Sequence, residues 1–229
     1  MVEVYSLHIQ ESLDHSLFHT AQTLIGSDKR ERMHKFLRLE DSVRLVLTDV
    51  LIRSVIVAKT GLRNSQIVFG KSRFGKPYLK GCQDFRFSLS HSGDWVVCSI
   101  GREENGVDVE HVQPINLKIA QRFFTKHEYD AILQKPLTDR SRAFYKLWTL
   151  KESYVKAIGT GLTTPMDSFV VEESNDSCSI KVLGMKMDYS LKTYDLDSDY
   201  CVSVCSKENT ISGRIVYKSL RKVINDIKC

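Results

Sequence analysis

The sequence lacks the features that would place a protein in or across a membrane. No apolar run approaches the roughly 20 residues that a membrane-spanning helix needs. The first seven residues, Met-Val-Glu-Val-Tyr-Ser-Leu, contain no basic region followed by a long apolar stretch, so they do not form a signal peptide. We therefore expect a protein of the cytoplasm that has no membrane partner.

The sequence also lacks a run of lysines and arginines long enough to act as a nucleic-acid arm. Lys and Arg together number 33 against 28 Asp and Glu, which gives a formal net charge of +5. This mild excess indicates an anionic partner, but it does not indicate DNA or RNA in particular. We expect no nucleic-acid partner.

A metal-binding or disulfide-forming cysteine pattern is missing as well. The six cysteines contain no CxxC pair, and Cys201 and Cys205 bracket Val-Ser-Val in a strand-like run, so both face one side of a sheet. Free buried thiols are the expectation, which agrees with a cytoplasmic protein. The cysteines stand at positions 82, 98, 178, 201, 205 and 229.

The length and composition are those of a folded, globular chain. It has 229 residues, of which 42% are hydrophobic and 27% charged, enough for a substantial core. This length suits one large domain or two small ones. No low-complexity linker divides the chain, so two units would pack tightly.

Helix and strand patterns divide the chain into two halves of similar outline. Apolar residues near helical spacing predict a long helix over residues 29–59, which Gly61 ends. Thr125 and Glu128 form a capping box that opens a short helix, and a longer helix is predicted over 140–158. Shorter helices are predicted at 116–124 and 220–227, and strands at 1–7, 67–69, 85–89, 95–100, 106–110, 169–172, 179–182, 187–194, 200–205 and 214–217.

These patterns predict an α+β fold with two similar halves, each a long helix packed on a small antiparallel sheet. We place the halves at residues 1–104 and 105–229. A cleft between two such units is a common place for a ligand, so we expect the active site there.

The most informative segment is 106–110, Gly-Val-Asp-Val-Glu. Strand side chains alternate, so Asp108 and Glu110 point to one side while two valines point to the other. Two unpaired carboxylates on one face of a buried strand repel each other and resist ionisation, and a divalent cation removes that conflict. Oxygen ligands favour Mg²⁺, which also binds substrate phosphate. The alternative is a strand end with two solvated acids.

A second informative segment is 148–157, Trp-Thr-Leu-Lys-Glu-Ser-Tyr-Val-Lys-Ala, on the helix predicted over 140–158. Glu152 and Lys156 are one turn apart, which suits either a third metal ligand beside a phosphate-binding lysine or a solvated ion pair. Lys151 falls in the apolar stripe of this helix. It therefore either reaches a carboxylate or phosphate, or extends to water along its stem.

Further residues suit phosphate binding. Ser90 and His91 lie in Phe-Ser-Leu-Ser-His-Ser-Gly, residues 87–93, where small hydroxyls surround a histidine at a strand end. A nucleophilic serine with a histidine base is the alternative, although no orienting acid is evident. Lys29 and Arg32 begin the first long helix, where a bound anion would offset their repulsion by the helix dipole, and Lys76 lies in a tight turn. A solvated basic surface is the alternative for these three.

Taken together, these segments resemble the 4′-phosphopantetheinyl transferase family, in its larger, pseudo-dimeric type that activates peptide and polyketide synthetases. The acidic strand and the Trp-x-x-Lys-Glu helix, in this order and spacing, are the most specific of the matching features. The resemblance runs over nearly the whole chain, through segments 28–32, 74–77, 87–93, 106–110, 122–124 and 148–156.

The resemblance implies two α/β halves related by a pseudo-two-fold axis, with the active site between them. It implies transfer of the phosphopantetheine arm of coenzyme A to a serine of an acyl or peptidyl carrier protein, with release of adenosine 3′,5′-bisphosphate. Carrier domains of peptide, polyketide or fatty-acid synthases are the implied partners. A monomer is expected because the two halves already build one cleft.

The resemblance also implies a role for each matched residue. Asp108, Glu110 and Glu152 resemble ligands of Mg²⁺, with Mn²⁺ as an alternative, and Glu152 resembles the base for the carrier serine. Lys156 resembles the lysine that contacts the transferred phosphate, which makes Asp108, Glu152 and Lys156 the expected catalytic residues. The residues that resemble the coenzyme A pocket are Lys29, Arg32, Lys76, Ser90, His91 and Lys156.

Two other functions remain open from the sequence. A Mg²⁺-dependent nucleotide phosphohydrolase would share the acids but would act through water and need no carrier protein. A non-catalytic module that binds coenzyme A or a carrier would not need the acids together with Lys156. Incubation with coenzyme A and an unmodified carrier distinguishes these from the transferase.

Overall fold

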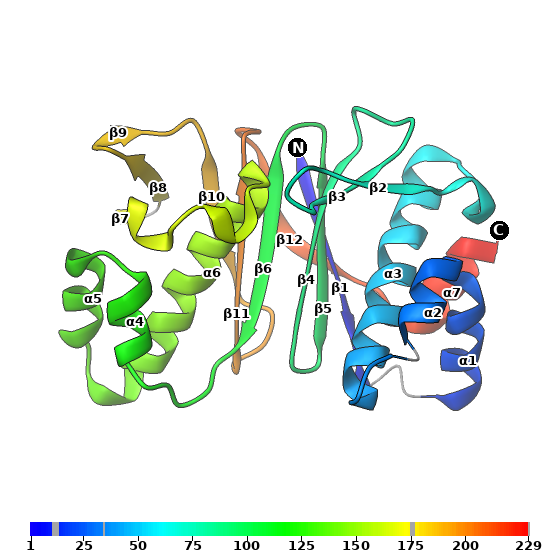
Figure 1. The fold of residues 1–229 in the computed structure, drawn as a ribbon, viewed down its shortest axis with the longest axis horizontal. Helices are drawn as coiled ribbons and strands as arrows, with labels where there is room; N and C mark the ends of the chain where they lie inside the picture. Colours follow the sequence, from blue (N-terminus) through cyan, green and yellow to red (C-terminus); the bar gives the residue numbers. More distant parts are fainter. Residues whose placement is uncertain (11–13, 34, 175–176, 229) are drawn as a thin grey trace.

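Two β-sheets form the middle of the protein, and helices cover the outer side of each. The computed structural model describes residues 1–10, 14–33, 35–174 and 177–228. Figure 1 shows α1, α2, α3 and α7 on one side of the sheets and α4, α5 and α6 on the other. The α+β class expected from the sequence is confirmed. Within the described residues, every helix is too short or too polar to cross a bilayer.

The first sheet has the strand order β12-β1-β5-β4, with β12 parallel to β1 and the other pairs antiparallel. Its strands are β1 (Val2–His8), β4 (Arg86–Ser92), β5 (Trp95–Gly101) and β12 (Ile211–Tyr217). A separate hairpin joins β2 (Phe69–Lys71) and β3 (Pro77–Leu79). The helices of this side are α1 (His15–Leu24), α2 (Ser27–Met33), α3 (Leu39–Thr60) and α7 (Leu220–Lys228).

The second sheet has the order β6-β11-β10-β8-β7 and is antiparallel throughout. Its strands are β6 (Asn105–His111), β7 (Phe169–Ser174), β8 (Ser177–Val182), β10 (Ser190–Tyr194) and β11 (Tyr200–Ser206), while the short β9 (Met185–Lys186) pairs with β8. The helices of this side are α4 (Lys118–Phe123), α5 (Lys126–Leu133) and α6 (Arg140–Ile158).

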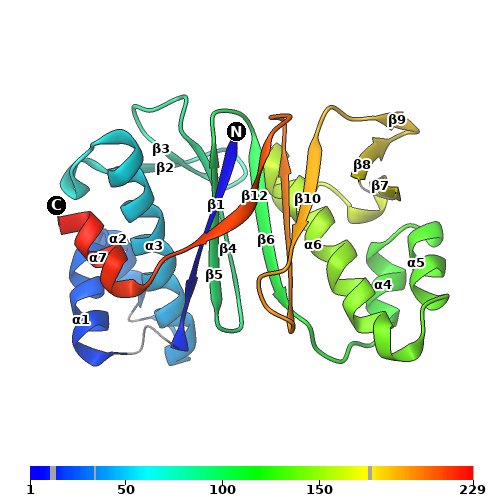
Figure 2. The same ribbon diagram turned by 180° about the vertical axis from the view of Figure 1, so that it is seen from behind.

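The last two elements of the chain return to the first sheet. β12 pairs with β1 at the sheet edge, and α7 packs against α3 (Figure 2). Leu220, Val223 and Ile224 of α7 belong to the same buried cluster as α3. Residues 211–228, which the predicted division at residue 104 assigns to the second half, therefore complete the core of the first.

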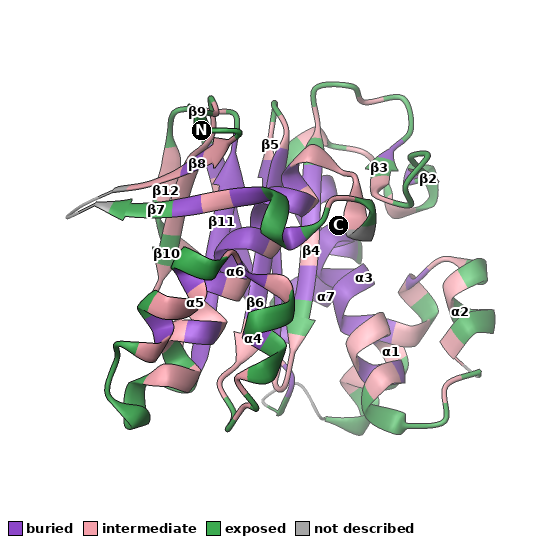
Figure 3. Ribbon diagram, turned by 60° about the vertical axis from the view of Figure 1, so that its left-hand side comes forward, coloured by how far each residue is buried: buried purple, intermediate pink, exposed green. Residues whose placement is uncertain are grey.

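Buried side chains form three clusters, one under each helical layer and one between the sheets. The central strands are mostly buried, whereas α2, α4 and α5 carry exposed residues (Figure 3). We call the third cluster the inter-sheet core, because strands of both sheets contribute to it. It consists of Val2, Val4, Trp95, Val97, Val107, Val109, Tyr200, Val202 and Val204.

The single helix predicted over residues 29–59 is wrong, because the structure has two helices there. α2 ends at Met33 and α3 begins at Leu39, with extended backbone at Arg38 (φ −110°, ψ 133°). The side chains of Leu37 and Leu39 are 103% and 73% exposed, so this stretch gains nothing from burying a helical apolar face. The apolar residues of the predicted helix are buried only from Val43 onward.

The cysteine expectation agrees with the structure where it can be compared. The five cysteines among the described residues are free, and Cys229 lies outside the described residues. Cys201 and Cys205 both face α6 from β11, since Cys201 Sγ donates to the Arg142 carbonyl and Cys205 lies in the core under α6.

Candidate active site between the two sheets

The acidic strand packs directly under the long helix of the second half. Val107 and Val109 of β6 lie in the inter-sheet core, so Asp108 and Glu110 point toward α6, as strand alternation predicts. Gly106 allows this close packing. A Cβ built there would stand 2.0 Å from the carbonyl oxygen of Ser153, an atom that cannot move without moving α6.

A row of serines on β4 connects the two sheets at this point. Ser88, Ser90 and Ser92, which we call the serine row, alternate along the strand and face β6. Ser88 Oγ accepts from the Val107 N–H (3.2 Å), Ser90 Oγ donates to Asp108 Oδ1 (2.8 Å) and Ser92 Oγ donates to Glu110 Oε2 (2.8 Å). The hydroxyls therefore hold both carboxylates in place.

Lys156 of α6 completes this arrangement. Its ammonium group lies 2.6 Å from Asp108 Oδ1 and 2.9 Å from Ser90 Oγ. The alternative of a solvated ion pair between Glu152 and Lys156 is wrong, because Lys156 pairs with Asp108 from the neighbouring strand. Ser90 is likewise bound to a carboxylate and a lysine rather than to His91, which removes the serine nucleophile as an interpretation. We call Ser90, Asp108, Glu110, Glu152 and Lys156 the transfer cluster.

Two carboxylates of the transfer cluster, those of Glu110 and Glu152, resist ionisation. Burial and the negative charge of Asp108 raise the pKa of Glu110 to about 7, although Ser92 and Lys156 oppose the shift. Burial and Asp108 also raise the pKa of Glu152, against the opposing effect of Lys156. No hydrogen bond or ion pair to another described residue holds the Glu152 carboxylate. The repulsion anticipated from the sequence is therefore present, and it extends to the third acid.

One buried oxygen of the transfer cluster lacks a partner. Asp108 is 3% exposed, and its Oδ2 accepts no hydrogen bond from any described residue. Such atoms are rare in folded proteins because each costs free energy. Among the described residues, no group of three His, Cys, Asp or Glu side chains is already arranged to hold a metal ion. The donor set fits a cation that binds few protein oxygens and keeps its waters, as Mg²⁺ does.

Lys76 reaches this region from the turn before β3. Its Nζ donates to the carbonyls of Asn105 (2.9 Å) and Ala157 (3.1 Å), which joins the start of β6 to the end of α6. Burial lowers the pKa of Lys76 to about 8. The residue lines a cavity of about 790 Å³, together with Phe74 and Arg86.

His91 lies at the exposed end of β4 and faces two cations. Desolvation by the surrounding protein lowers the pKa of its imidazole, and the positive charges of Arg44 and Lys156 add to this effect. Arg44 Nε donates to the carbonyl of Gly93 in the turn that follows. The structure thus brings Ser90, His91 and Lys156 together at one end of the cluster.

Lys29 and Arg32 lie apart from the transfer cluster. Lys29 Nζ is 2.6 Å from Asp49, a fully buried acid that also holds Arg53 at 2.6 Å. Lys29 and Arg53 line a separate cavity of about 360 Å³. Arg32 is exposed and its guanidinium lies 5.6 Å from the centroid of the Phe36 ring. Among the described residues, no hydrogen bond or ion pair links Lys29 or Arg32 to Asp108.

Lys151, beside the transfer cluster in sequence, has a structural position. It is fully buried, pairs with Glu128 at 2.9 Å and donates to the carbonyls of Met166 and Phe169. Glu128 is also the residue of the predicted capping box, which is confirmed with Thr125. The expectation that Lys151 reaches a carboxylate is correct, and the alternative that its stem leads to water is wrong.

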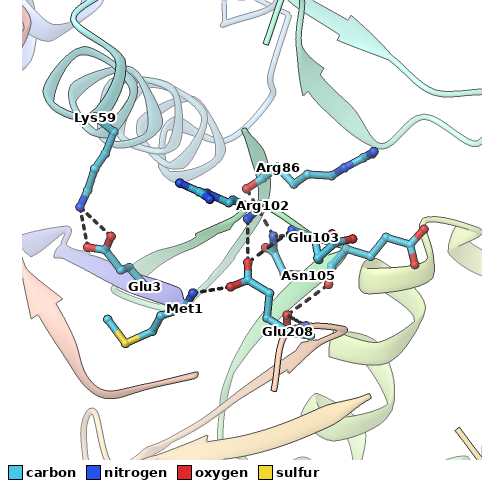
Figure 4. Close-up of polar contacts among 10 residues, drawn as sticks. Met1, Glu3, Lys59, Arg86, Arg102, Glu103, Asn105 and Glu208 are labelled. Atoms are coloured by element: carbon cyan, nitrogen blue, oxygen red, sulfur yellow. Dashed lines mark hydrogen bonds and ion pairs between the residues drawn. The ribbon is translucent and has the colours of Figure 1, made fainter. Parts of the chain in front are cut away.

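A polar network fixes the start of β6. The Glu208 carboxylate accepts from the Met1 ammonium group and from the N–H groups of Arg102 and Glu103 (Figure 4). Asn105 Nδ2 donates to the carbonyls of Arg86 and Glu103. The strand that carries Asp108 and Glu110 is thereby held to the first sheet at this end.

Sequence reasoning did not identify three residues that position the acidic strand. Ser92, Asn105 and Gly106 were not identified as site residues. The serine row has a signal that could have been used, because its spacing of two matches the spacing of Asp108 and Glu110. Asn105 and Gly106 have no comparable signal, since their importance comes from contacts between segments far apart in sequence.

Comparisons with known proteins agree on one family. The model of the 4′-phosphopantetheinyl transferase superfamily matches residues 104–205, and that of the 4′-phosphopantetheinyl transferase N-terminal region matches residues 13–102. The chain is 37% identical to 4′-phosphopantetheinyl transferase Sfp of Bacillus subtilis (strain 168), over 90% of this chain and 92% of that protein. It is 29% identical to 4′-phosphopantetheinyl transferase gsp of Aneurinibacillus migulanus, over 95% and 91%. A crystal structure of Thermotoga maritima holo-[acyl-carrier-protein] synthase is 23% identical, with a TM-score of 0.38 over 45% of this chain and 61% of that chain.

Proposed function

This chain belongs to the 4′-phosphopantetheinyl transferase superfamily, and from that premise we propose that the transfer cluster is its active site. The chain is an enzyme that moves the 4′-phosphopantetheine group of coenzyme A to a serine of a carrier protein. Adenosine 3′,5′-bisphosphate is the other product. The proposal concerns which residues of the chain perform this reaction.

Glu152 is the proposed base for the carrier serine. In the reaction, the serine oxygen forms a bond to phosphorus, the bond between the two phosphates of coenzyme A breaks, and the bisphosphate leaves with that electron pair. The serine proton goes to Glu152. Its raised pKa makes this carboxylate a better proton acceptor than an ordinary glutamate, and no described partner competes for it.

Asp108, Glu110 and Glu152 are the proposed ligands of Mg²⁺, with Mn²⁺ as the second candidate. A bound divalent cation would neutralise charge on the phosphate oxygens of coenzyme A during transfer. The unpartnered Oδ2 of Asp108 and the raised pKa of Glu110 support this assignment.

Lys156 is the proposed contact for the transferred phosphate. Its Nζ already bridges Asp108 and Ser90, and a lysine ammonium has three hydrogens to donate, so a third partner can be added. Ser90 holds Asp108 in position. The remaining proposed contacts to coenzyme A are Lys29, Arg32, Lys76 and His91.

The observation that carries the proposal is Asp108, a buried carboxylate with one oxygen on Lys156 and the other without a described partner. Mass spectrometry of an apo carrier protein after reaction with coenzyme A and Mg²⁺ tests it. We expect the wild-type chain to add the phosphopantetheine mass and Asp108→Asn to lose at least a thousandfold in rate. Glu172→Gln, which changes an exposed acid paired with Lys181, is the matched control and should keep full activity. Equal rates for Asp108→Asn and the control would contradict the assignment.

A magnesium-dependent phosphohydrolase is the alternative. It would cleave coenzyme A or a nucleotide without any carrier, so products released in the absence of carrier would favour it. We expect none above background.

An acyl or peptidyl carrier protein is the proposed partner. The proposed oligomeric state is a monomer, since one chain supplies every residue of the cluster, and the proposed compartment is the cytoplasm.

A further inference from the structure

A second pocket lies between the sheets, away from the transfer cluster. It has a volume of about 580 Å³ and opens between β10 of the second sheet and β12 of the first. Both strands are seen in Figure 2, which views the molecule from behind Figure 1. None of its lining residues belongs to the transfer cluster. We call it the rear pocket.

A glycine keeps the rear pocket open. Gly213 lines the pocket as an exposed residue between Ile211 and Ile215, at the point where the register of β12 against β1 shifts. A Cβ built on Gly213 meets nothing within 4 Å, and its backbone needs no positive φ. A side chain at this position would therefore occupy open space at the pocket.

A buried hydroxyl without a partner lies at the rear pocket. Ser6 lines it and is 0% exposed, and its Oγ has no hydrogen-bond partner among the described residues. Val4 contributes to the inter-sheet core and Tyr5 to the opposite cluster, so Ser6 faces the space between the sheets. A buried hydroxyl normally has a hydrogen-bond partner, and where the described chain supplies none, an ordered water or a bound molecule can supply it.

The walls of the rear pocket are aromatic and positively charged. Trp95 and Tyr217 are in edge contact, with ring centroids 6.3 Å apart, at one side. Tyr194 is fixed by a hydrogen bond from its hydroxyl to the Ser212 carbonyl, and its ring lies 5.5 Å from Lys192 Nζ. The charged lining residues are two cations, Lys192 and Arg214, and one acid, Asp195.

We propose that the rear pocket is a second binding site of this enzyme, for a small flat aromatic anion. The aromatic walls accept a planar body by stacking and edge contacts. Lys192 and Arg214 attract a negative group, and arginine pairs readily with carboxylate, sulfonate or phosphate oxygens. Ser6 supplies one hydrogen bond deep in the pocket. No residue of the transfer cluster lines this site.

The fluorescent aromatic sulfonate 8-anilinonaphthalene-1-sulfonate is a suitable probe, titrated against the full chain. We expect saturable binding of one molecule that an excess of coenzyme A does not displace. Gly213→Leu, which fills the open position, should weaken binding at least tenfold. Val216→Leu is the matched control, because it adds a leucine at an exposed position of the same strand and should leave binding unchanged.

Two further variants keep the test decisive if Gly213→Leu does not fold. Arg214→Glu reverses an exposed charge and should weaken the probe about tenfold. Ser6→Ala should weaken it about threefold while leaving the unfolding midpoint the same or higher, since the hydroxyl has no protein partner to lose. Absence of saturable binding, displacement of the probe by coenzyme A, or unchanged affinity in Arg214→Glu would each overturn the proposal.

Discussion

Asp108 and Lys156 depend on each other more than on any other residue of the site. The Asp108 side chain is 4% exposed and that of Lys156 28%, so removing either leaves the other charge partly buried without compensation. We predict that Lys156→Met lowers the free energy of unfolding by about 2 kcal/mol, at the low end for such pairs because Lys156 is partly solvated. Urea unfolding measures the change.

A double-mutant cycle isolates this pair. Asp108→Asn in the Lys156→Met background removes the uncompensated charge, so the double variant should be more stable than Lys156→Met alone. Lys181→Met, which breaks an exposed pair with Glu172, is the control and should have little effect. A double variant whose loss equals the sum of the two single losses would show that the pair is not coupled.

Lys76 should give the protein a distinctive pH dependence. The pKa of Lys76 is about 8 in the folded protein, below its ordinary value of 10.5, because burial disfavours the charged form. Between these two values the unfolded chain binds the proton and the folded chain does not, so stability rises with pH. We predict that the stability of wild type relative to Lys76→Met increases from pH 8 to pH 10, as followed by urea unfolding. A constant difference would mean that Lys76 titrates normally.

At the scale of residues, the sequence predicted the identity of the site residues better than it predicted their contact partners. The shared face of Asp108 and Glu110 follows from strand alternation, which is local. The partner of Lys156 lies on β6, the strand against which α6 packs, rather than one helical turn away, and only that packing determines the pair. The placement of Lys29 on Asp49 is a long-range contact of the same kind.

Among the elements, the contact between β6 and α6 determines the site. Gly106→Ala would put a methyl group 2.0 Å from the Ser153 carbonyl, so the helix must shift. We predict a loss of about 2–3 kcal/mol in the free energy of unfolding, as for overpacked cores, and a fall in transfer rate that exceeds what unfolding explains. Gly213→Ala is the matched control because its Cβ meets open space. Equal stability of the two variants would contradict this packing.

Glu128 joins three elements of the second half. It caps α5 through Thr125, accepts the N–H of Val171 on β7 and pairs with the buried Lys151 on α6. We predict that Glu128→Gln costs about 3 kcal/mol of stability, because it leaves the Lys151 ammonium buried without its counter-ion. Asp130→Asn, which changes a solvated pair on the same helix, should not shift the thermal midpoint measurably. A similar midpoint for both variants would refute the buried pair.

The elements themselves were predictable where local signals define them. α6 begins and ends at the predicted residues, since Gly159 in left-handed conformation stops it and an apolar stripe runs its length. The single helix over 29–59 was not predicted correctly, because the backbone is extended at Arg38 and the exposed Leu37 and Leu39 gain no burial from a continuous helix. The strand predicted over 187–194 starts only at Ser190, after a separate short β9.

For the whole molecule, the arrangement of the sheets accounts for both binding regions. The serine row closes the space between the sheets at β4 and β6, where the transfer cluster lies, while β10 and β12 leave the rear pocket. The sequence did not predict that β12 pairs with β1 or that α7 packs against α3. Parallel pairing of the first and the last strand is a contact between the most distant parts of the chain.

The most direct test of the account is coenzyme A binding measured by calorimetry with and without Mg²⁺. If the carboxylates of β6 and α6 hold a cation that the diphosphate shares, Mg²⁺ should tighten coenzyme A binding to the wild-type chain at least tenfold. The same addition should change the affinity of Asp108→Asn by no more than about twofold. An equal gain from Mg²⁺ in both proteins would contradict the central claim.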